Sequence, residues 1–175
     1  SVIKSGADEM VKVSNDNADA TATLETAIEN AATEMATADT KETINGISEA
    51  LKNAIVTFIT AATPTTGNKF DLTCLLTNPN LEGLPTWKAA DGWYTEQKDG
   101  NSQVMVNDSK TNGSYTAFYE YWSQTAKTSG YTVYLKINLP KGVYGMTAQA
   151  FAEDQDGQDV FDGITFSAND VDGSK

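Results

Sequence analysis

The sequence predicts an α+β chain in which a small helical bundle, residues 1–66, precedes an antiparallel β-sandwich, residues 67–175. Three observations support this prediction. Residues 1–63 are rich in Ala, Thr and Glu, and their apolar positions recur at helical spacing. Pro64 and Gly67 then mark a joint between two compositions. After the joint, short runs alternate between apolar and polar residues, and every aromatic residue except Phe58 lies there.

Two long amphipathic helices are predicted in the first part. The apolar face of the earlier one consists of Leu24, Ile28, Ala31, Ala32 and Met35. Residues 37–40 interrupt this pattern, and Asp39 and Glu42 have the spacing of a capping pair. The face of the second helix consists of Ile44, Ile47, Leu51, Ile55, Phe58 and Ile59.

A shorter helix is predicted before these two, around residues 7–14, with Met10, Val11 and Val13 as its apolar residues. Asn15, Asp16 and Asn17 form the turn that follows it. The first part is therefore expected to be a bundle of about three helices. Its many Ala and Thr residues imply closely packed helices around a modest core.

The second part is predicted to consist of short strands. They span residues 70–76, 103–107, 115–122, 131–139, 143–152 and 164–168. Turns at residues 78–80 and 140–142 separate them, and Gly92-Trp93 has the character of a fixed corner. Because no helical periodicity falls between these strands, they indicate an antiparallel sandwich.

The charge balance excludes several classes of function. The chain has 12 Lys, 24 acidic residues, no His and no Arg, for a net charge of −12. Such a chain repels nucleic acid and anionic membrane surfaces. The lack of His removes Ser–His and Cys–His nucleophile pairs, and the lack of Arg removes bidentate phosphate clamps. We therefore predict a protein that is not an enzyme. Neutral or cationic ligands, including sugars and Ca²⁺, are compatible with this composition.

Cys74 and the chain start carry little functional signal. Cys74 has no partner for an intrachain disulfide, and its place in the run FDLTCLL predicts a buried core residue rather than a reactive thiol. Residues 1–10 lack the basic and apolar regions of a signal peptide. No stretch approaches the ~20 apolar residues of a membrane span, so no membrane insertion is expected in this segment.

An ordered set of motifs in the second part resembles a known family. The motifs are Phe70-Asp71-Leu72-Thr73, Asn78-Pro79-Asn80-Leu81-Glu82, Gly92-Trp93, Tyr119-Glu120-Tyr121-Trp122, residues 131–135, and Leu139-Pro140-Lys141-Gly142-Val143-Tyr144 leading to Phe151. Together they resemble the galactose-binding-like jelly rolls, similar to carbohydrate-binding modules, of surface and secreted proteins from glycan-foraging gut anaerobes. The helices before the joint are similar to the spacers that precede such modules.

The resemblance implies a jelly roll, a glycan ligand and an extracellular or cell-surface location. Two departures accompany it. Leu135-Lys136 stands where the family usually has Gln before its next apolar residue. The family also continues for several strands beyond the length of this chain, so the sandwich is expected to be incomplete at its C-terminal end, with an open edge.

Aromatic residues are the candidate sugar ligands, because pyranose rings present apolar C–H faces that stack on indole and phenol rings. The candidates are Trp87, Tyr94, Tyr119 and Trp122. Trp87 lies in a polar loop beside Pro85 and is the candidate most expected to be exposed. Trp93 is expected in the core, and so, on balance, is Trp122. The alternative for every one of them is ordinary sandwich packing.

An acidic loop is the candidate metal site. Asp154, Asp156 and Asp159 surround Gly157 and offer the hard oxygen ligands that Ca²⁺ prefers. The spacing is not that of an EF-hand, because Gly falls at the fourth position and no Glu stands at the twelfth. A solvated acidic loop is the alternative, and no other cofactor is expected.

Three functions follow from these patterns. The first is a non-catalytic glycan-binding or adhesion module with a helical spacer. The second is a structural or protein-interaction module of a larger surface protein or glycoside hydrolase. The third is a glycosidase with two carboxylates, for which Glu82, Glu96 and Glu120 are scattered and form no recognisable motif.

Overall fold

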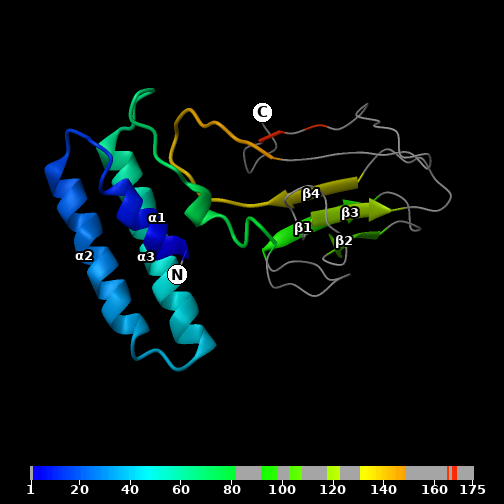
Figure 1. The fold of residues 1–175 in the computed structure, drawn as a ribbon, viewed down its shortest axis with the longest axis horizontal. Coiled ribbons are helices and arrows are strands. Elements are labelled where there is room, and N and C mark those ends of the chain that lie inside the picture. Colours follow the sequence, from blue (N-terminus) through cyan, green and yellow to red (C-terminus); the bar gives the residue numbers. More distant parts are fainter. Residues whose placement is uncertain are drawn as a thin grey trace. The chain divides into compact units, whose positions relative to one another are not determined.

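The computed structural model describes residues 2–81, 92–97, 103–107, 118–122, 131–148, 165 and 167–168 (Figure 1). Its helices are α1 (Val2–Met10), α2 (Ala18–Met35) and α3 (Lys41–Ala62), followed by a 3₁₀ turn, η1 (Thr73–Leu75). Its strands are β1 (Trp93–Gln97), β2 (Gln103–Asn107), β3 (Phe118–Trp122) and β4 (Tyr131–Leu135). The chain is therefore a mixed α and β protein, with helices before strands as predicted.

The chain divides into two compact units, Ser1–Lys141 and Gly142–Lys175. All helices and strands named above belong to the first unit. The predicted boundary between residues 66 and 67 separates the last helix from η1 and the strands in sequence, and the division into domains 1–66 and 67–175 stays a prediction.

The helices form the bundle that the apolar pattern predicts. Figure 1 shows α2 and α3 antiparallel and side by side, and α1 contacts both. The buried core comprises Ala7, Met10, Leu24, Ile28, Leu51, Ile55, Phe58, Ile59, Ala62, Cys74 and Leu75. Leu24, Ile55, Met10 and Phe58 are at most 2% exposed. Four of the helical-face residues differ from the prediction, because Ala32 and Ile44 are exposed and Ala31 and Met35 are only partly buried.

Side chains fix the helix starts. Asn17 caps α2, because its Oδ1 accepts a hydrogen bond from the Ala20 amide at 2.9 Å. Thr40 caps α3, because its Oγ1 accepts from the Thr43 amide at 3.1 Å. The predicted capping pair of Asp39 and Glu42 is wrong: with α3 starting at Lys41, Glu42 lies one residue too early to bond back to the cap.

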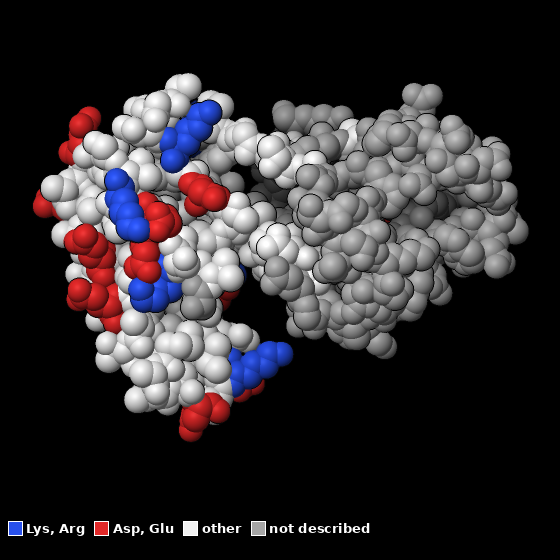
Figure 2. Space-filling model, viewed as in Figure 1, with Lys and Arg blue, Asp and Glu red and all other residues white. Residues whose placement is uncertain are grey.

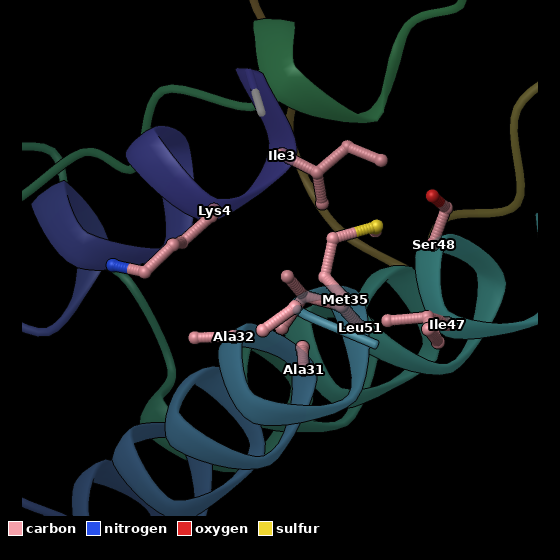
Figure 3. Close-up of a pocket in the computed structure, with 9 residues that line it drawn as sticks. Ile3, Lys4, Ala31, Ala32, Met35, Ile47, Ser48 and Leu51 are labelled. Carbon is pink, nitrogen blue, oxygen red and sulfur yellow. The ribbon is translucent and has the colours of Figure 1, made fainter. Parts of the chain in front are cut away.

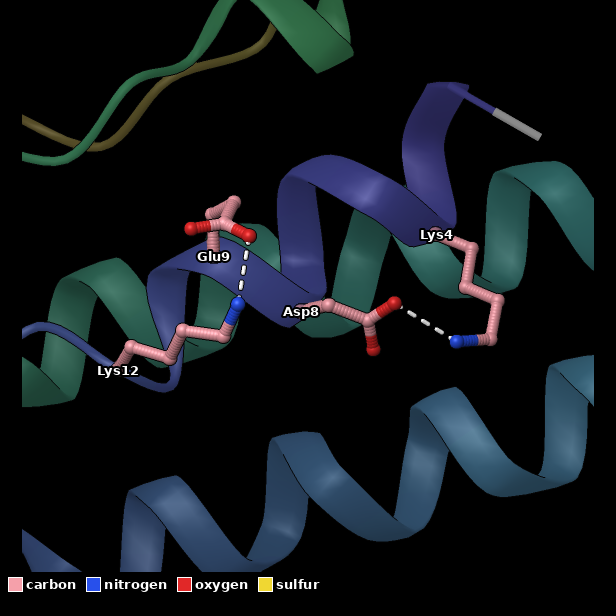
Figure 4. Close-up of polar contacts among 4 residues, drawn as sticks. All are labelled: Lys4, Asp8, Glu9 and Lys12. Atoms are coloured by element: carbon pink, nitrogen blue, oxygen red, sulfur yellow. Dashed lines mark hydrogen bonds and ion pairs between the residues drawn. The ribbon is translucent and has the colours of Figure 1, made fainter.

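The helix ends also differ in part from prediction. The first helix spans residues 2–10 rather than 7–14, because Val11 to Val13 already belong to the turn that Asn15 closes by donating to the Val13 carbonyl at 3.1 Å. Two ion pairs lie on this segment, from Lys4 to Asp8 at 2.7 Å and from Lys12 to Glu9 at 2.6 Å (Figure 4). The last helix ends as predicted, with Thr63 in the left-handed conformation directly before Pro64.

The predicted strand at residues 70–76 is wrong, since the segment folds as a turn against the helices. Asp71 Oδ1 accepts from the Thr73 amide at 2.9 Å. Hydrogen bonding from the Thr73 side chain, and then from this amide, holds the pKa of Asp71 below its usual value. The Leu75 amide donates to the Leu72 carbonyl at 2.9 Å and closes η1. The Phe70 ring lies 5.2 Å from that of Phe58, between ring centroids. Cys74 is buried, as predicted, but within the helical core rather than a sandwich.

The strands form two antiparallel pairs, β1 with β4 and β2 with β3. The predicted strand at 103–107 is confirmed, and strands lie within the predicted ranges 115–122 and 131–139. The predicted corner at Gly92-Trp93 is present, because Gly92 turns the chain with a φ of 79°, but strand β1, which starts at Trp93, was not predicted. The predicted strand at 143–152 is wrong for its described part, since residues 143–148 do not pair as a strand. Of the predicted strand 164–168, the structure describes residues 165, 167 and 168, which are not strand.

Candidate functional site

An exposed polar and aromatic surface covers one side of the β1–β4 pair. Side chains alternate along a strand, so residues two apart share a side. We call this side the tyrosine face, and its members are Tyr94, Glu96, Thr132, Tyr134 and Lys136. All but the half-buried Tyr134 are exposed. The residues of the opposite side, Trp93, Thr95, Val133 and Leu135, are all half-buried. The burial pattern therefore marks the tyrosine face as the solvent side of the pair.

Two tyrosines form the centre of this face. Tyr94 and Tyr134 are cross-strand partners, and their rings stack with centroids 5.2 Å apart and planes inclined by 17°. Such a pair stabilises a ladder by roughly 0.2–1 kcal/mol and holds both rings in fixed orientations. Tyr94 remains 45% exposed. The pair therefore presents a pre-ordered aromatic surface to solvent.

Charged groups flank the tyrosine pair. The Lys136 ammonium lies 5.3 Å from the centroid of the Tyr94 ring, within the range of a cation–π contact. Partial burial raises the pKa of the Tyr134 hydroxyl, and the charge of Glu96 and a hydrogen bond to its carboxylate raise that pKa further. The Tyr134 hydroxyl therefore stays protonated at neutral pH, and Glu96 lies on the same side of the ladder. The face thus combines a hydroxyl, a carboxylate and an ammonium around two rings.

The predicted ligand-binding residues are only partly within the described structure. Tyr94 is exposed on the tyrosine face, next to Tyr134 and Lys136. Tyr119 and Trp122 lie in β3, whose side chains are outside the described part, and Trp87 is outside it altogether. Asp154, Asp156 and Asp159 also lie outside the described residues. Of the scattered glutamates, Glu96 alone has a described side chain.

Sequence reasoning missed Tyr134 and Lys136 as members of a site. Tyr134 belongs to a correctly predicted strand, and the alternation of residues 131–135 could have placed it on a polar side. The pairing of this strand with residues 93–97 could not be foreseen, because that segment was not predicted to be a strand. Without the pairing, nothing links Tyr94 with residues 40 positions later in the chain.

A cleft lies in the helical bundle (Figure 3). It has a volume of about 330 Å³ and is lined by Ile3, Lys4, Ala31, Ala32, Met35, Ala36, Ile47, Ser48 and Leu51. Small alanines on α2 leave the space, and the aliphatic side chains of Ile3, Met35 and Ile47 make its lining apolar. The lining residues include no carboxylate or thiol, and the polar ones among them are Lys4 and Ser48. The chemistry of the cleft therefore suits apolar contact.

The helical part is strongly acidic on the side of α2. Between Lys12 and Lys41 the chain has no basic residue, while α2 carries Asp19, Glu25, Glu29 and Glu34. Figure 2 shows acidic side chains along the edge of the bundle where α2 lies in Figure 1. Within the described ranges, no group of three or more Cys, Asp or Glu side chains could hold a metal ion. The acidity is therefore distributed along the surface.

Cys74 is the one thiol of the chain and lies in the core. Burial raises the pKa of the Cys74 thiol, and the charge of Asp71 raises it further. The thiol therefore stays protonated at neutral pH, which is the reverse of what a nucleophilic cysteine needs. Its role is to fill space between η1 and α1.

In comparisons with known proteins, no family model, curated protein sequence or solved structure matches this chain. Among the helices of the described residues, none is both long enough and apolar enough to cross a membrane.

Proposed function

We propose that this protein is a non-catalytic glycan-binding module of an extracellular or cell-surface protein, and that the tyrosine face is its binding surface. The observation that supports this proposal is the stacked and exposed pair of Tyr94 and Tyr134. Sugar rings place apolar C–H groups on such rings, and two rings held by a strand pair lose little entropy when they bind.

The neighbours of the two rings supply the polar part of sugar recognition. Glu96 and Thr132 are cross-strand partners on the same side and offer acceptors and a hydroxyl for sugar hydroxyl groups. The tyrosine face lies on one side of a strand pair, which suits contact along a surface polysaccharide. The proposal includes the wider fold that the motifs imply, in which both strand pairs belong to a galactose-binding-like jelly roll.

The absence of His and Arg from the chain supports the non-catalytic part of the proposal. Two-carboxylate glycoside hydrolysis would still be open to such a composition. It needs one carboxyl group held protonated beside a second carboxylate, whereas Glu96 lies on an exposed surface and is the one carboxylate of the tyrosine face. Glu96 therefore has the surroundings of a binding residue rather than of a general acid.

The test is a glycan array followed by calorimetry on the glycans that bind. Tyr94→Ala removes the exposed ring, and we expect it to weaken binding by about five- to thirty-fold, since each stacked ring contributes on the order of 1–2 kcal/mol. Ile44→Ala is the matched control, because Ile44 is a large side chain that is similarly exposed at 40% but lies on α3. Equal affinities of the Tyr94→Ala variant and the unchanged protein would refute the proposed site.

The apolar cleft in the helical bundle favours a second function, a protein-interaction module. An open cleft lined by Ile3, Met35 and Ile47 leaves apolar surface that a partner could cover. The two functions differ in the array experiment. A folded protein that binds no glycan would favour the interaction module and leave the tyrosine face as ordinary strand packing.

A further inference from the structure

Lys136 makes a cation–π contact with the Tyr94 ring. The Lys136 ammonium is held 5.3 Å from the ring centroid by its position two residues after Tyr134. The π face of a phenol ring carries partial negative charge, so a cation over it is attracted. The ring of Tyr94 is therefore already a cation-accepting surface, and Lys136 occupies it.

Lys136 has no carboxylate within ion-pair distance in the described part of the chain, where the ion pairs are Lys4–Asp8, Lys12–Glu9 and Lys52–Glu49. The Lys136 side chain is exposed, and an exposed cation–π contact contributes only about 0.5–1 kcal/mol. Another cation can therefore displace Lys136 at little cost.

The surroundings favour a cation as that competitor. Glu96 lies on the same face, two residues from Tyr94, and gives it a negative group. The whole chain carries a net charge of −12, which attracts cationic ligands and repels polyanionic ones. If the Lys136 ammonium left the Tyr94 ring, the negative charge of Glu96 would be the charge nearest to that ring among the members of the tyrosine face.

We propose that the ligand of the tyrosine face is a glycan with free amino groups, such as a de-N-acetylated hexosamine chain, whose ammonium replaces that of Lys136 over the Tyr94 ring. This inference rests on the proposed glycan-binding function and adds the class of sugar. Lys136 then competes with the amino sugar for the Tyr94 ring, and this competition lowers the affinity of the tyrosine face for the sugar.

The experiment compares two oligosaccharide series of equal length by calorimetry, glucosamine oligomers and their N-acetylated counterparts, in a mildly acidic buffer that keeps the amine protonated. We expect the glucosamine series to bind more tightly, and its binding to weaken with added salt. Lys136→Gln should tighten glucosamine binding by about two- to five-fold, because it removes the competing cation.

Lys141→Gln is the matched control, because Lys141 is an exposed lysine outside the tyrosine face. Lys141→Gln removes one positive charge but leaves Lys136 over the Tyr94 ring. Comparing the two variants therefore separates the effect of freeing the ring from the effect of a lower overall charge. Equal gains in affinity for the two variants would overturn displacement at the ring.

Failure of this inference can be told apart from failure of the proposed function. If N-acetylated or other neutral glycans bind through Tyr94 while glucosamine oligomers bind no better, the amino-sugar inference is overturned and glycan binding stands. If the unchanged protein binds none of the sugars tested, in the array or by calorimetry, both are overturned. If Lys136→Gln weakens glucosamine binding, Lys136 contacts the ligand and its role as a competitor is excluded.

Discussion

Gly6 determines how closely α1 approaches η1. A methyl group at this position would collide with Cβ and Sγ of Cys74, which is buried against the helix. The glycine makes helix α1 less stable at this position, because Gly in a helix costs about 1 kcal/mol relative to Ala. The gain is close packing between a helix at the chain start and a turn that follows the last helix.

We therefore predict that Gly6→Ala destabilises the protein by about 1–3 kcal/mol, since overpacking outweighs the gain in propensity. Gly46→Ala in α3 is the control, because a methyl group there meets no atom within 4 Å. That variant should stabilise by up to about 1 kcal/mol. Urea unfolding measures both changes.

Adding Cys74→Gly to Gly6→Ala removes both colliding atoms, so the double variant should lose less stability than the sum of the single variants. A Gly6→Ala variant as stable as Gly46→Ala would contradict the close contact.

At the scale of elements, Asn17 connects the start of α2 with the end of α3. Its Oδ1 accepts from the Ala20 amide at 2.9 Å, and its Nδ2 donates to the Ala61 carbonyl at 3.3 Å. One side chain therefore satisfies an unpaired amide of one helix and a terminal carbonyl of the other. The antiparallel arrangement of α2 and α3 brings these two ends together (Figure 1).

Substitutions at Asn17 should separate these two roles. Asn17→Ala loses both hydrogen bonds, and we expect a loss of about 1–2 kcal/mol in unfolding free energy. Asn17→Asp keeps the cap and loses only the donor to Ala61, so its loss should be smaller. Chemical denaturation followed by helical circular dichroism measures both. Equal losses for the two variants would show that the cap contributes little.

The two sides of the β1–β4 pair also have different roles. In β1 and β4 one side of the ladder is half-buried and the other carries the tyrosine face. A shift of one residue in the register would exchange the two sides. The site therefore depends on the register that pairs Tyr94 with Tyr134, as much as on either tyrosine.

At the scale of the whole molecule, the segment after the joint completes the helical core. Cys74 and Leu75 are buried members of that core, and Phe70, Leu72 and Leu139 pack against it. Residues 1–66 alone would expose part of Phe58 and its neighbours to water. The bundle therefore depends on residues that lie beyond the joint in sequence.

We predict that a fragment of residues 1–81 is more stable than one of residues 1–66 by about 3 kcal/mol, from the burial of Phe70, Cys74 and Leu75. Thermal unfolding of the purified fragments measures the difference. A fragment of residues 1–69, which keeps the joint but ends before Phe70, should behave like 1–66. Equal stability of 1–66 and 1–81 would establish the helices as an independent domain.

Much of the helical part could be predicted from the sequence because its signals are local. The spacing of Leu24 and Ile28, or of Leu51 and Ile55, places them on one helical face whatever else the chain does. The break at residues 37–40 and the end before Pro64 also follow from neighbouring residues. The capping residue was missed because the cap depends on the first helical residue, which fraying and local bonds shift by one or two positions.

The strand regions were predicted less completely because pairing is not local. Alternation identified residues 103–107 and 131–135, but β1 contains Thr, Glu and Gln and has no apolar alternation to signal it. Residues 70–76 have the apolar content of a strand, yet Asp71 turns the chain and the helical core takes up Cys74 and Leu75. Burial against a distant surface there outweighed local preference.

The sequence by itself determined the two long helices, the helix end before Pro64, the acidity of the chain and the absence of His and Arg side chains, because each depends on composition or on residues a few positions apart. Only the tertiary structure decided that Tyr94 meets Tyr134, that Lys136 covers the Tyr94 ring and that Cys74 packs on Gly6. These contacts join residues far apart in the chain, and they form only when strand pairing and core packing bring those segments together.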